Sequence, residues 1–186
     1  DKYELTEIGQ SISTLRTENE LWVGLVLLSG YLDELTPPDL ASVIQGICVE
    51  IRRPDLWCNN KPSARVNEVF NEITIIKKLI SAQQSKYAID TPLYLEKDLT
   101  GITSEWAKGK KWKEVVFNTS LDEGDIVRII RRTIDILSQI QFCVGLSSKL
   151  KNKAKLALKM INRFPVAESQ DLANISENNN INPATK

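Results

Sequence analysis

The chain has 186 residues, of which 42% are hydrophobic and 26% charged, so a single domain of this length can bury a core. Lysine plus arginine and aspartate plus glutamate each number 24, which excludes a histone-like polycation but leaves room for a local basic face. The sequence contains no histidine, which excludes Ser-His-Asp catalysis, Cys-His catalysis and histidine metal sites.

The first third of the chain predicts three helices with clear start and stop signals. A short helix is predicted over 6–15, and Asn19 and Gly30 bracket a buried helix over 20–28. Thr36-Pro37-Pro38-Asp39 combines an N-cap residue, prolines in the first turn and an acid near the positive helix end. It is predicted to open a helix that runs to about Ile51.

The middle of the chain predicts a long helix and a shorter one. The long helix starts at Ser63 and runs to about Tyr87, with a buried side predicted at Val66, Val69, Phe70, Ile73, Ile76, Ile80 and Gln83. A second helix is predicted over 96–108, and it contains Trp106 and stops at Gly109.

The remaining helices carry most of the basic residues. A short helix is predicted over 111–118. Ser120 and Glu123 have capping-box spacing and are predicted to begin a helix that reaches about Val144, with an inward face at Ile126, Ile129, Ile130, Thr133, Ile136, Leu137 and Ile140. A last helix is predicted over 147–164. Residues 168–186 are rich in Asn, Ser, Glu and Pro, which predicts a disordered tail.

These elements predict an all-α bundle of about seven helices, organised as one domain over residues 1–167 with a tail over 168–186. The cysteines Cys48, Cys58 and Cys143 are too few and too widely spaced for a disulfide framework or a zinc knuckle, which predicts reduced thiols in a reducing compartment. No apolar run approaches the roughly 20 residues that span a bilayer, so no membrane partner is expected. The first residues lack a signal peptide pattern and an initiator Met, so we expect a fragment of a longer protein.

The balanced net charge hides a basic segment. Residues 108–164 contain thirteen Lys or Arg and five Asp or Glu, so this segment carries +8 and the rest of the chain −8. Basic charge beside Trp106 and Trp112, including that of Lys110 and Lys111, suits a nucleic-acid backbone. The alternative is an ordinary solvated helix face, above all over 149–159.

The helix predicted over 122–144 carries one polar stripe. Arg128, Arg132, Asp135 and Gln139 follow helical spacing opposite the isoleucine face, with Arg131 beside them. Guanidinium and amide groups in such a stripe can stack on and hydrogen-bond to unpaired bases. The alternative is that Asp135 forms intrahelical ion pairs with Arg131 or Arg132.

No catalytic group stands out, and no cofactor or metal site is predicted for this chain. Gly109-Lys110-Lys111 has no upstream glycine at phosphate-loop spacing, and Leu121-Asp122-Glu123-Gly124-Asp125 lacks the acid spacing of a calcium loop. Glu50 follows the apolar stripe of its helix, where an ion pair to Arg53 or a neighbouring arginine is the simplest role.

The order of the motifs resembles one known family. The first block comprises Leu5-Thr6-Glu7-Ile8-Gly9, Asn19-Glu20-Leu21 and the Thr36-Pro37-Pro38-Asp39 helix ending in Val49-Glu50. The second comprises Trp106-Ala107-Lys108-Gly109, Trp112 and Glu123-Gly124-Asp125-Ile126-Val127-Arg128 with Arg131-Arg132. Together they resemble the C-terminal helical DSHCT domain of DExH-box RNA helicases of the Dob, Ski and HelY type, and the wording around Trp22 and Trp57 resembles the cyanobacterial or chloroplast branch.

The resemblance implies a role in RNA guidance. In such helicases two RecA-like domains hydrolyse ATP with Mg²⁺, a winged-helix domain follows, and the helical domain closes over the RNA exit path as a ratchet. Residues 1–9 then correspond to the seam with the winged-helix domain, and Glu50 and Arg132 correspond to family positions that reach RNA bases. The implied partners are single-stranded RNA, the helicase core and an RNA-processing complex, in cyanobacterial cytoplasm or chloroplast stroma. Because the chain lacks ATPase motifs, it is not expected to be an enzyme alone.

Two other functions compete with this one. The chain could be a helical protein-interaction scaffold that packs on a helicase core and barely contacts RNA. Alternatively, residues 111–118 and 122–144 could form a helix-turn-helix that reads duplex DNA. The acidic start of the second helix argues against the latter, because it would face phosphates.

Overall fold

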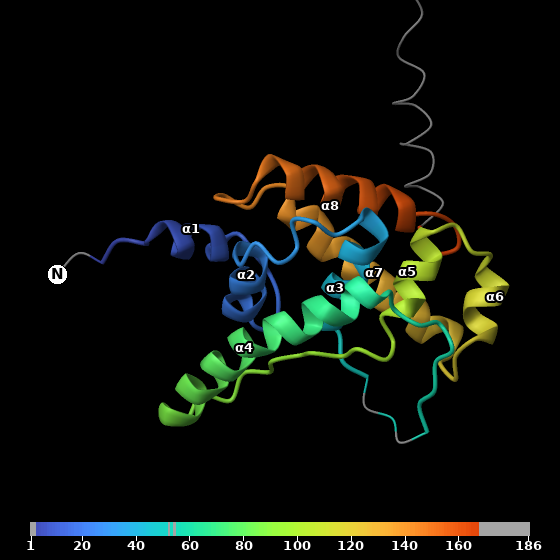
Figure 1. Cartoon of the computed structure of the whole chain (residues 1–186), viewed down its shortest axis with the longest axis horizontal. Coiled ribbons are helices and arrows are strands. Elements are labelled where there is room, and N and C mark those ends of the chain that lie inside the picture. Colours follow the sequence, from blue (N-terminus) through green and yellow to red (C-terminus); the bar gives the residue numbers. More distant parts are fainter. Residues whose placement is uncertain (1–2, 52, 54, 168–186) are drawn as a thin grey trace, which may run out of the picture.

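The computed structural model describes residues 3–51, 53 and 55–167. Within these ranges the regular structure is helical, apart from one isolated bridge between Cys58 and Thr119 (Figure 1). The helices are α1 (Glu7–Ser13), α2 (Glu20–Leu28), α3 (Pro37–Cys48), α4 (Ala64–Lys86), α5 (Gly101–Ala107), α6 (Trp112–Phe117), α7 (Glu123–Ile140) and α8 (Ser148–Ile161). The all-α prediction is confirmed, with eight helices in the described ranges. The predicted tail over 168–186 lies outside them.

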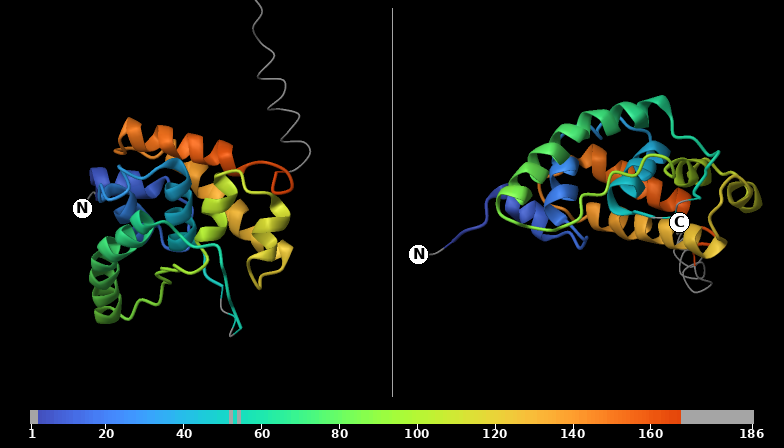
Figure 2. Two further views of the ribbon diagram at one scale, coloured as in Figure 1. Left: turned by 45° about the vertical axis from the view of Figure 1, so that its right-hand side comes forward. Right: turned by 90° about the horizontal axis from the view of Figure 1, so that it is seen from below.

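Helix α3 is the centre of the bundle. It packs against α4, α5, α7 and α8, and each residue from Asp39 to Cys48 is buried. Two of its polar side chains bond backbone at the start of α5, because Ser42 Oγ donates to Thr100 O (2.7 Å) and Gln45 Nε2 donates to Leu99 O (2.9 Å). Helices α8 and α4 lie on opposite sides of α3 (Figures 1 and 2).

The predicted helix starts are confirmed at three positions. The side chains of Asn19, Thr36 and Ser63 each accept a hydrogen bond from a backbone N–H in the first turn of α2, α3 and α4. Asp39 also joins two of these starts, because its carboxylate accepts from Thr36 Oγ1 (2.7 Å) and Ser63 Oγ (2.8 Å). The chain therefore fixes the relative position of α3 and α4 with local capping residues.

Two predicted helix boundaries near the centre are wrong. Helix α3 ends at Cys48 rather than Ile51, because Val49 has extended backbone angles (φ −130°, ψ 134°). Helix α5 begins at Gly101 rather than at residue 96. The segment before it has no regular secondary structure and is held against α3 and α2, because Glu96 N donates to Gly46 O (2.8 Å) and Trp22 Nε1 donates to Tyr94 O (3.0 Å).

Three further predictions differ from the structure. Ser120 does not cap α7, because its hydroxyl instead accepts from Trp57 N (3.0 Å), and the N-cap residue is Asp122. Helix α7 ends at Ile140, short of Val144, and Gln83 on α4 is exposed rather than buried. Residues 3–6 have no regular secondary structure and extend away from the body (Figure 2).

Candidate nucleic-acid interface

Helix α7 positions the predicted polar stripe. Its buried residues are those predicted from the sequence, namely Ile126, Ile129, Ile130, Thr133, Ile136, Leu137 and Ile140. These side chains hold α7 against α3 and α8. The rotation of the helix about its own axis is thereby fixed, and Arg128, Arg131 and Asp135 are turned outward while Arg132 is half-buried.

A first hollow lies where the end of α3 meets α7. It has a volume of about 210 Å³ and is lined by Glu18, Cys48, Glu50, Tyr94, Arg128 and Arg132. We call it the Glu50 hollow. It brings Glu50, which follows α3, together with two arginines of α7 that are about eighty positions later in the sequence. Carboxylate and guanidinium groups from separate elements thus face one small space.

The ion pairs of the described residues around the Glu50 hollow do not involve the Arg132 guanidinium. Arg128 pairs with Asp125 (3.1 Å), whereas Arg132 forms no ion pair within the described ranges. Asp135 likewise makes no ion pair among the described residues, so the alternative of intrahelical pairing is not what the structure shows. The Arg132 guanidinium is therefore free to donate several hydrogen bonds to a ligand.

The position of Arg53 in the sequence suggested an ion pair with Glu50, but in the structure the ion pairs of Arg53 are with other acids. It pairs with Asp122 (3.7 Å) and Asp125 (3.5 Å) at the start of α7. These contacts tie the chain that follows Glu50 to the same helix that carries Arg128 and Arg132. They also place positive charge beside the acidic first turn of α7.

Cys48 lines the Glu50 hollow but is nearly inaccessible. Burial raises the pKa of its thiol to about 12, and the nearby Arg132 guanidinium only partly opposes this. All three cysteines are free and buried. Since the thiolate is the reactive form and only roughly 10⁻⁴ of a thiol with that pKa is ionised at pH 8, we expect almost no reaction of Cys48 with a thiol reagent in the native chain.

The measurement is a titration with a chromogenic disulfide reagent in buffer and in denaturant. We expect close to three thiols per chain in denaturant and slow, substoichiometric labelling in buffer at pH 8. Rapid native labelling at Cys48, located by peptide mapping, would show that the floor of the Glu50 hollow is open.

A second and larger hollow lies between α7 and α8. Its volume is about 780 Å³, and its lining includes Arg128, Arg131, Arg132, Asp135, Leu158 and Val166. We call it the α7–α8 hollow. Arg131 Nε donates to Val166 O (3.0 Å) at its edge. Arg128 and Arg132 line both hollows, so the arginine stripe forms the ridge between them.

The region that builds both hollows falls within a single known family. Residues 2–169 match the DSHCT (NUC185) domain. The chain belongs to the DSHCT family.

Three relatives place this DSHCT domain among helicases. It is 32% identical over 165 residues to the DExH-box ATP-dependent RNA helicase DExH15, chloroplastic, of Arabidopsis thaliana, which covers 87% of the chain and 14% of the relative. It is 22% identical over 178 residues to the probable helicase HelY of Mycobacterium leprae (strain TN), with 90% and 19% covered. It is 24% identical over 153 residues to DExH9 of Arabidopsis thaliana, with 80% and 15% covered. The chain thus spans less than a fifth of each relative, and the resemblance drawn from its motifs is confirmed.

Three of the predicted site residues lie elsewhere on the DSHCT domain. Gln139 Oε1 accepts from Arg16 N (2.6 Å) and so fastens α7 to the turn between α1 and α2. Lys110 pairs with Glu105 (3.3 Å), and Lys111 is exposed at the start of α6. The structure therefore groups Glu50, Arg128, Arg131 and Arg132, and leaves the other three outside the two hollows.

Sequence reasoning missed two residues of the Glu50 hollow. Tyr94 OH donates to Glu18 Oε2 (2.8 Å), and both side chains line the hollow. Their segments are far apart in sequence, and neither has a periodic pattern that marks a site. An aromatic ring beside two guanidiniums adds a stacking surface to the hydrogen-bonding groups.

The described residues bring no three His, Cys, Asp or Glu side chains together as metal ligands. Among them, no helix combines the length and apolar character needed to cross a membrane.

Proposed function

We propose that this DSHCT domain is an RNA-guiding accessory domain of an ATP-dependent DExH-box RNA helicase. The observation that carries the proposal is the convergence of Glu50, Arg128 and Arg132 on one hollow. The names of the relatives support the helicase context, since two of them are named as ATP-dependent RNA helicases.

The proposed mechanism divides the contacts into two kinds. Arg132 and Arg128 stack on or donate to unpaired bases, and Glu50 accepts from base N–H groups, so the ridge holds an exposed strand by its bases. Exposed lysines such as Lys111 and Lys113 supply salt-dependent attraction to the phosphates. The DSHCT domain itself needs no cofactor for this role. ATP and Mg²⁺ belong to the RecA-like domains of the full-length helicase.

The helicase core is the second proposed partner. Ile75 and Leu79 on α4 are 60% and 65% exposed, which suits packing against the RecA-like or winged-helix domains. We place the protein in chloroplast stroma or cyanobacterial cytoplasm, a proposal that the chloroplastic relative supports. The scaffold alternative shares this core contact and differs in predicting no RNA affinity.

The test is binding of a fluorescent single-stranded RNA to the chain across a salt series. We expect affinity that falls with salt, and Arg132→Ala to weaken it about tenfold, because loss of one base contact costs on the order of 1–3 kcal/mol. Glu50→Ala removes a negative charge and so strengthens general attraction to phosphates. A weaker affinity of Glu50→Ala would therefore identify a direct contact with RNA.

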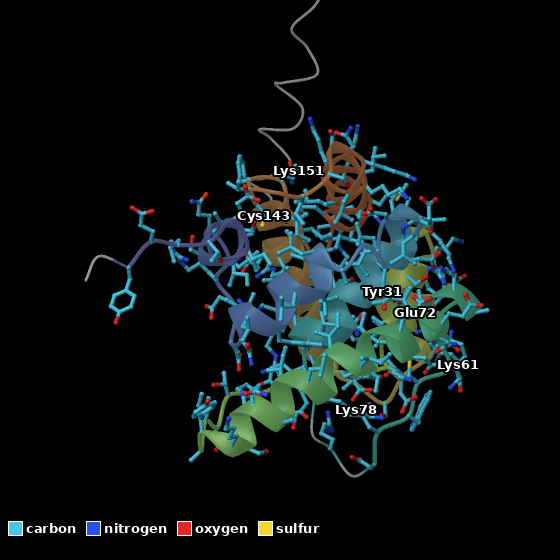
Figure 3. The ribbon with its side chains drawn as sticks, turned by 60° about the vertical axis from the view of Figure 1, so that its left-hand side comes forward. Tyr31, Lys61, Glu72, Lys78, Cys143 and Lys151 are labelled. Atoms are coloured by element: carbon cyan, nitrogen blue, oxygen red, sulfur yellow. The ribbon has the colours of Figure 1, made fainter. Side chains whose placement is uncertain are left out.

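Lys78→Ala is the matched control. Lys78 is an exposed cation on α4, on the opposite side of the molecule from Lys151 of α8 (Figure 3). Its loss removes the same charge as Arg132→Ala, and we expect less than a twofold change. Equal losses of RNA affinity in Arg132→Ala and Lys78→Ala would show that Arg132 contributes only general electrostatic attraction. No RNA binding at low salt would favour the scaffold alternative.

A further inference from the structure

The α7–α8 hollow combines positive charge with an apolar wall. Arg128, Arg131 and Arg132 line it together with the single acid Asp135. Val127, Ile134, Leu158 and Val166 form the apolar part of the lining. A segment that fits this space carries several carboxylates and a few apolar side chains.

The described chain ends at the rim of this hollow. Val166 lines the hollow, and its carbonyl accepts from Arg131 Nε (3.0 Å). Val166 and Ala167 are buried and both donate their backbone N–H to Arg163 O. Arg163 is in turn fixed to the end of α5 through Trp106 O (2.7 Å) and to the α5–α6 connection through Lys110 O (2.9 Å). Whatever follows Ala167 therefore starts beside Arg131.

The sequence after Ala167 has the complementary chemistry. Residues 168–186 contain the acids Glu168, Asp171 and Glu177 and one base, Lys186, so they carry −2. Leu172 and Ile175 stand between these acids. A fully extended chain of four residues reaches roughly 13 Å, which brings Asp171 and Leu172 within reach of the hollow without any rearrangement of the bundle.

We propose that residues 168–186 bind back into the α7–α8 hollow of their own chain. Glu168 and Asp171 pair with the arginines of α7, and Leu172 and Ile175 cover the apolar wall. Tethering strengthens this contact, because a short linker holds the segment at an effective concentration on the order of millimolar. Weak ion pairs and a small apolar contact are then sufficient for occupancy.

Docking has a consequence for RNA, and this consequence alone rests on the proposed function. Arg128 and Arg132 line both hollows, so an acidic segment bound to them competes with RNA for the same guanidiniums. The segment then acts as an autoinhibitory mimic of the phosphate backbone. If it is docked nine-tenths of the time, it raises the apparent Kd for RNA about tenfold.

The docking is tested first without RNA, in the intact chain. Ser176→Cys supplies a site for a nitroxide spin label, and the three native thiols are buried, so we expect them to be labelled slowly. We expect paramagnetic broadening of the backbone amides of 124–135 and 158–166, with little effect on α4. Neutralising the segment with Glu168→Gln, Asp171→Asn and Glu177→Gln is expected to reduce the broadening strongly, as is salt above about 0.5 M, where the Debye length falls to a few ångströms.

The matched control keeps the three acids of the segment and removes a charge at its far end. Lys186→Ala leaves all three acids in place and is expected to retain the broadening. Broadening that is absent in the labelled wild-type background, or that persists unchanged when the acids are neutralised, overturns the proposal.

The second arm measures RNA affinity with and without the segment. A chain ending at Ala167 keeps the whole described core, and we expect it to bind single-stranded RNA about tenfold more tightly than the intact chain at low salt. The neutralised intact chain should match it. If neither chain binds RNA but broadening is seen, docking stands and the proposed function fails. If both bind RNA equally and no broadening is seen, the hollow is open to RNA and the docking proposal fails.

Discussion

Gly101→Ala is expected to destabilise the domain by about 3 kcal/mol or more. A Cβ placed on Gly101 would lie 1.9 Å from Asn60 O and 2.2 Å from Asn60 C, and real Cβ atoms do not approach this closely. The obstacle is backbone, so no rotamer change relieves the clash. Asn60 cannot retreat easily, because it is buried and its Nδ2 donates to Val115 O (3.1 Å). The connection before α4 would have to separate from the start of α5.

Thermal and urea unfolding followed by circular dichroism at 222 nm measure this effect. For a domain of this size, 3 kcal/mol corresponds to a fall in Tm of roughly 6–12 °C. Gly124→Ala is the matched control, since it also lies in the first turn of a helix and a Cβ there meets nothing within 4 Å. We expect it to be neutral or stabilising by up to about 1 kcal/mol. Similar stabilities for the two variants would show that the α5 contact with Asn60 is looser than described.

The region around the start of α5 also shows where the sequence predicts the fold correctly and where it does not. Signals that act within one helix were read correctly, as with the Asn19, Thr36 and Ser63 caps and all seven inward residues of α7. The start of α5 was missed because tertiary contacts override local propensity there. Glu96 N bonds to Gly46 O on α3, and this holds residue 96 outside the helix that its sequence favours.

A second tertiary competition misplaced the α7 cap. Ser120 and Glu123 have the correct spacing, but the Ser120 hydroxyl bonds to the backbone of Trp57, more than sixty positions earlier. Asp122 takes the N-cap position without a side-chain bond. The Ser120 hydroxyl thus bonds to the distant Trp57 backbone instead of the first turn of α7, and nothing in residues 120–123 indicates this choice.

In the candidate site, too, local patterns predict some residues and tertiary packing supplies the others. Helical periodicity alone placed Arg128 and Arg132 on one exposed face. Glu50 was raised above an ordinary helix-end acid only by the family resemblance, and the structure places it in the hollow with both arginines. Glu18 and Tyr94 reach the hollow through the packing of two loops, which no single-segment pattern encodes. Gln139 satisfied the periodicity but bonds to Arg16 instead, because α7 extends past the hollow to the α1–α2 turn.

Trp106→Ala is expected to cost about 3–5 kcal/mol, the usual range for removing a buried tryptophan. Trp106 is 1% exposed and joins α5 to α8, since its Nε1 donates to Ile161 O (2.8 Å). The Arg163 guanidinium carbon lies 3.1 Å from the centre of its ring, and Trp112 packs edge-on with ring centroids 5.2 Å apart. Loss of the indole leaves a cavity, removes one of the two hydrogen bonds to Ile161 O, which still accepts from Arg163 N (3.0 Å), and leaves a cation without its aromatic partner.

Urea unfolding by circular dichroism measures the loss, with two further variants for comparison. Trp106→Phe keeps most of the ring but not the N–H donor, and we expect a smaller cost of about 1–3 kcal/mol. Trp57→Ala removes a tryptophan that is 48% exposed, and we expect a cost below about 1 kcal/mol. A Trp106→Ala loss no larger than that of Trp57→Ala would contradict the described packing of α5 on α8.

The Trp106→Phe variant is expected to affect the α7–α8 hollow and the Glu50 hollow differently. Leu158 and Val166 reach the α7–α8 hollow from the end of α8 and the turn after it, which Trp106 and Arg163 hold in place. The Glu50 hollow is built from α3, α7 and the loops at Glu18 and Tyr94, none of which contacts Trp106 through a side-chain hydrogen bond. Amide hydrogen exchange in Trp106→Phe should therefore rise in 158–167 and stay low in α3. Because this change loosens only one side of the arginine ridge, it should weaken docking of residues 168–186 more than base contacts at Glu50 and Arg132.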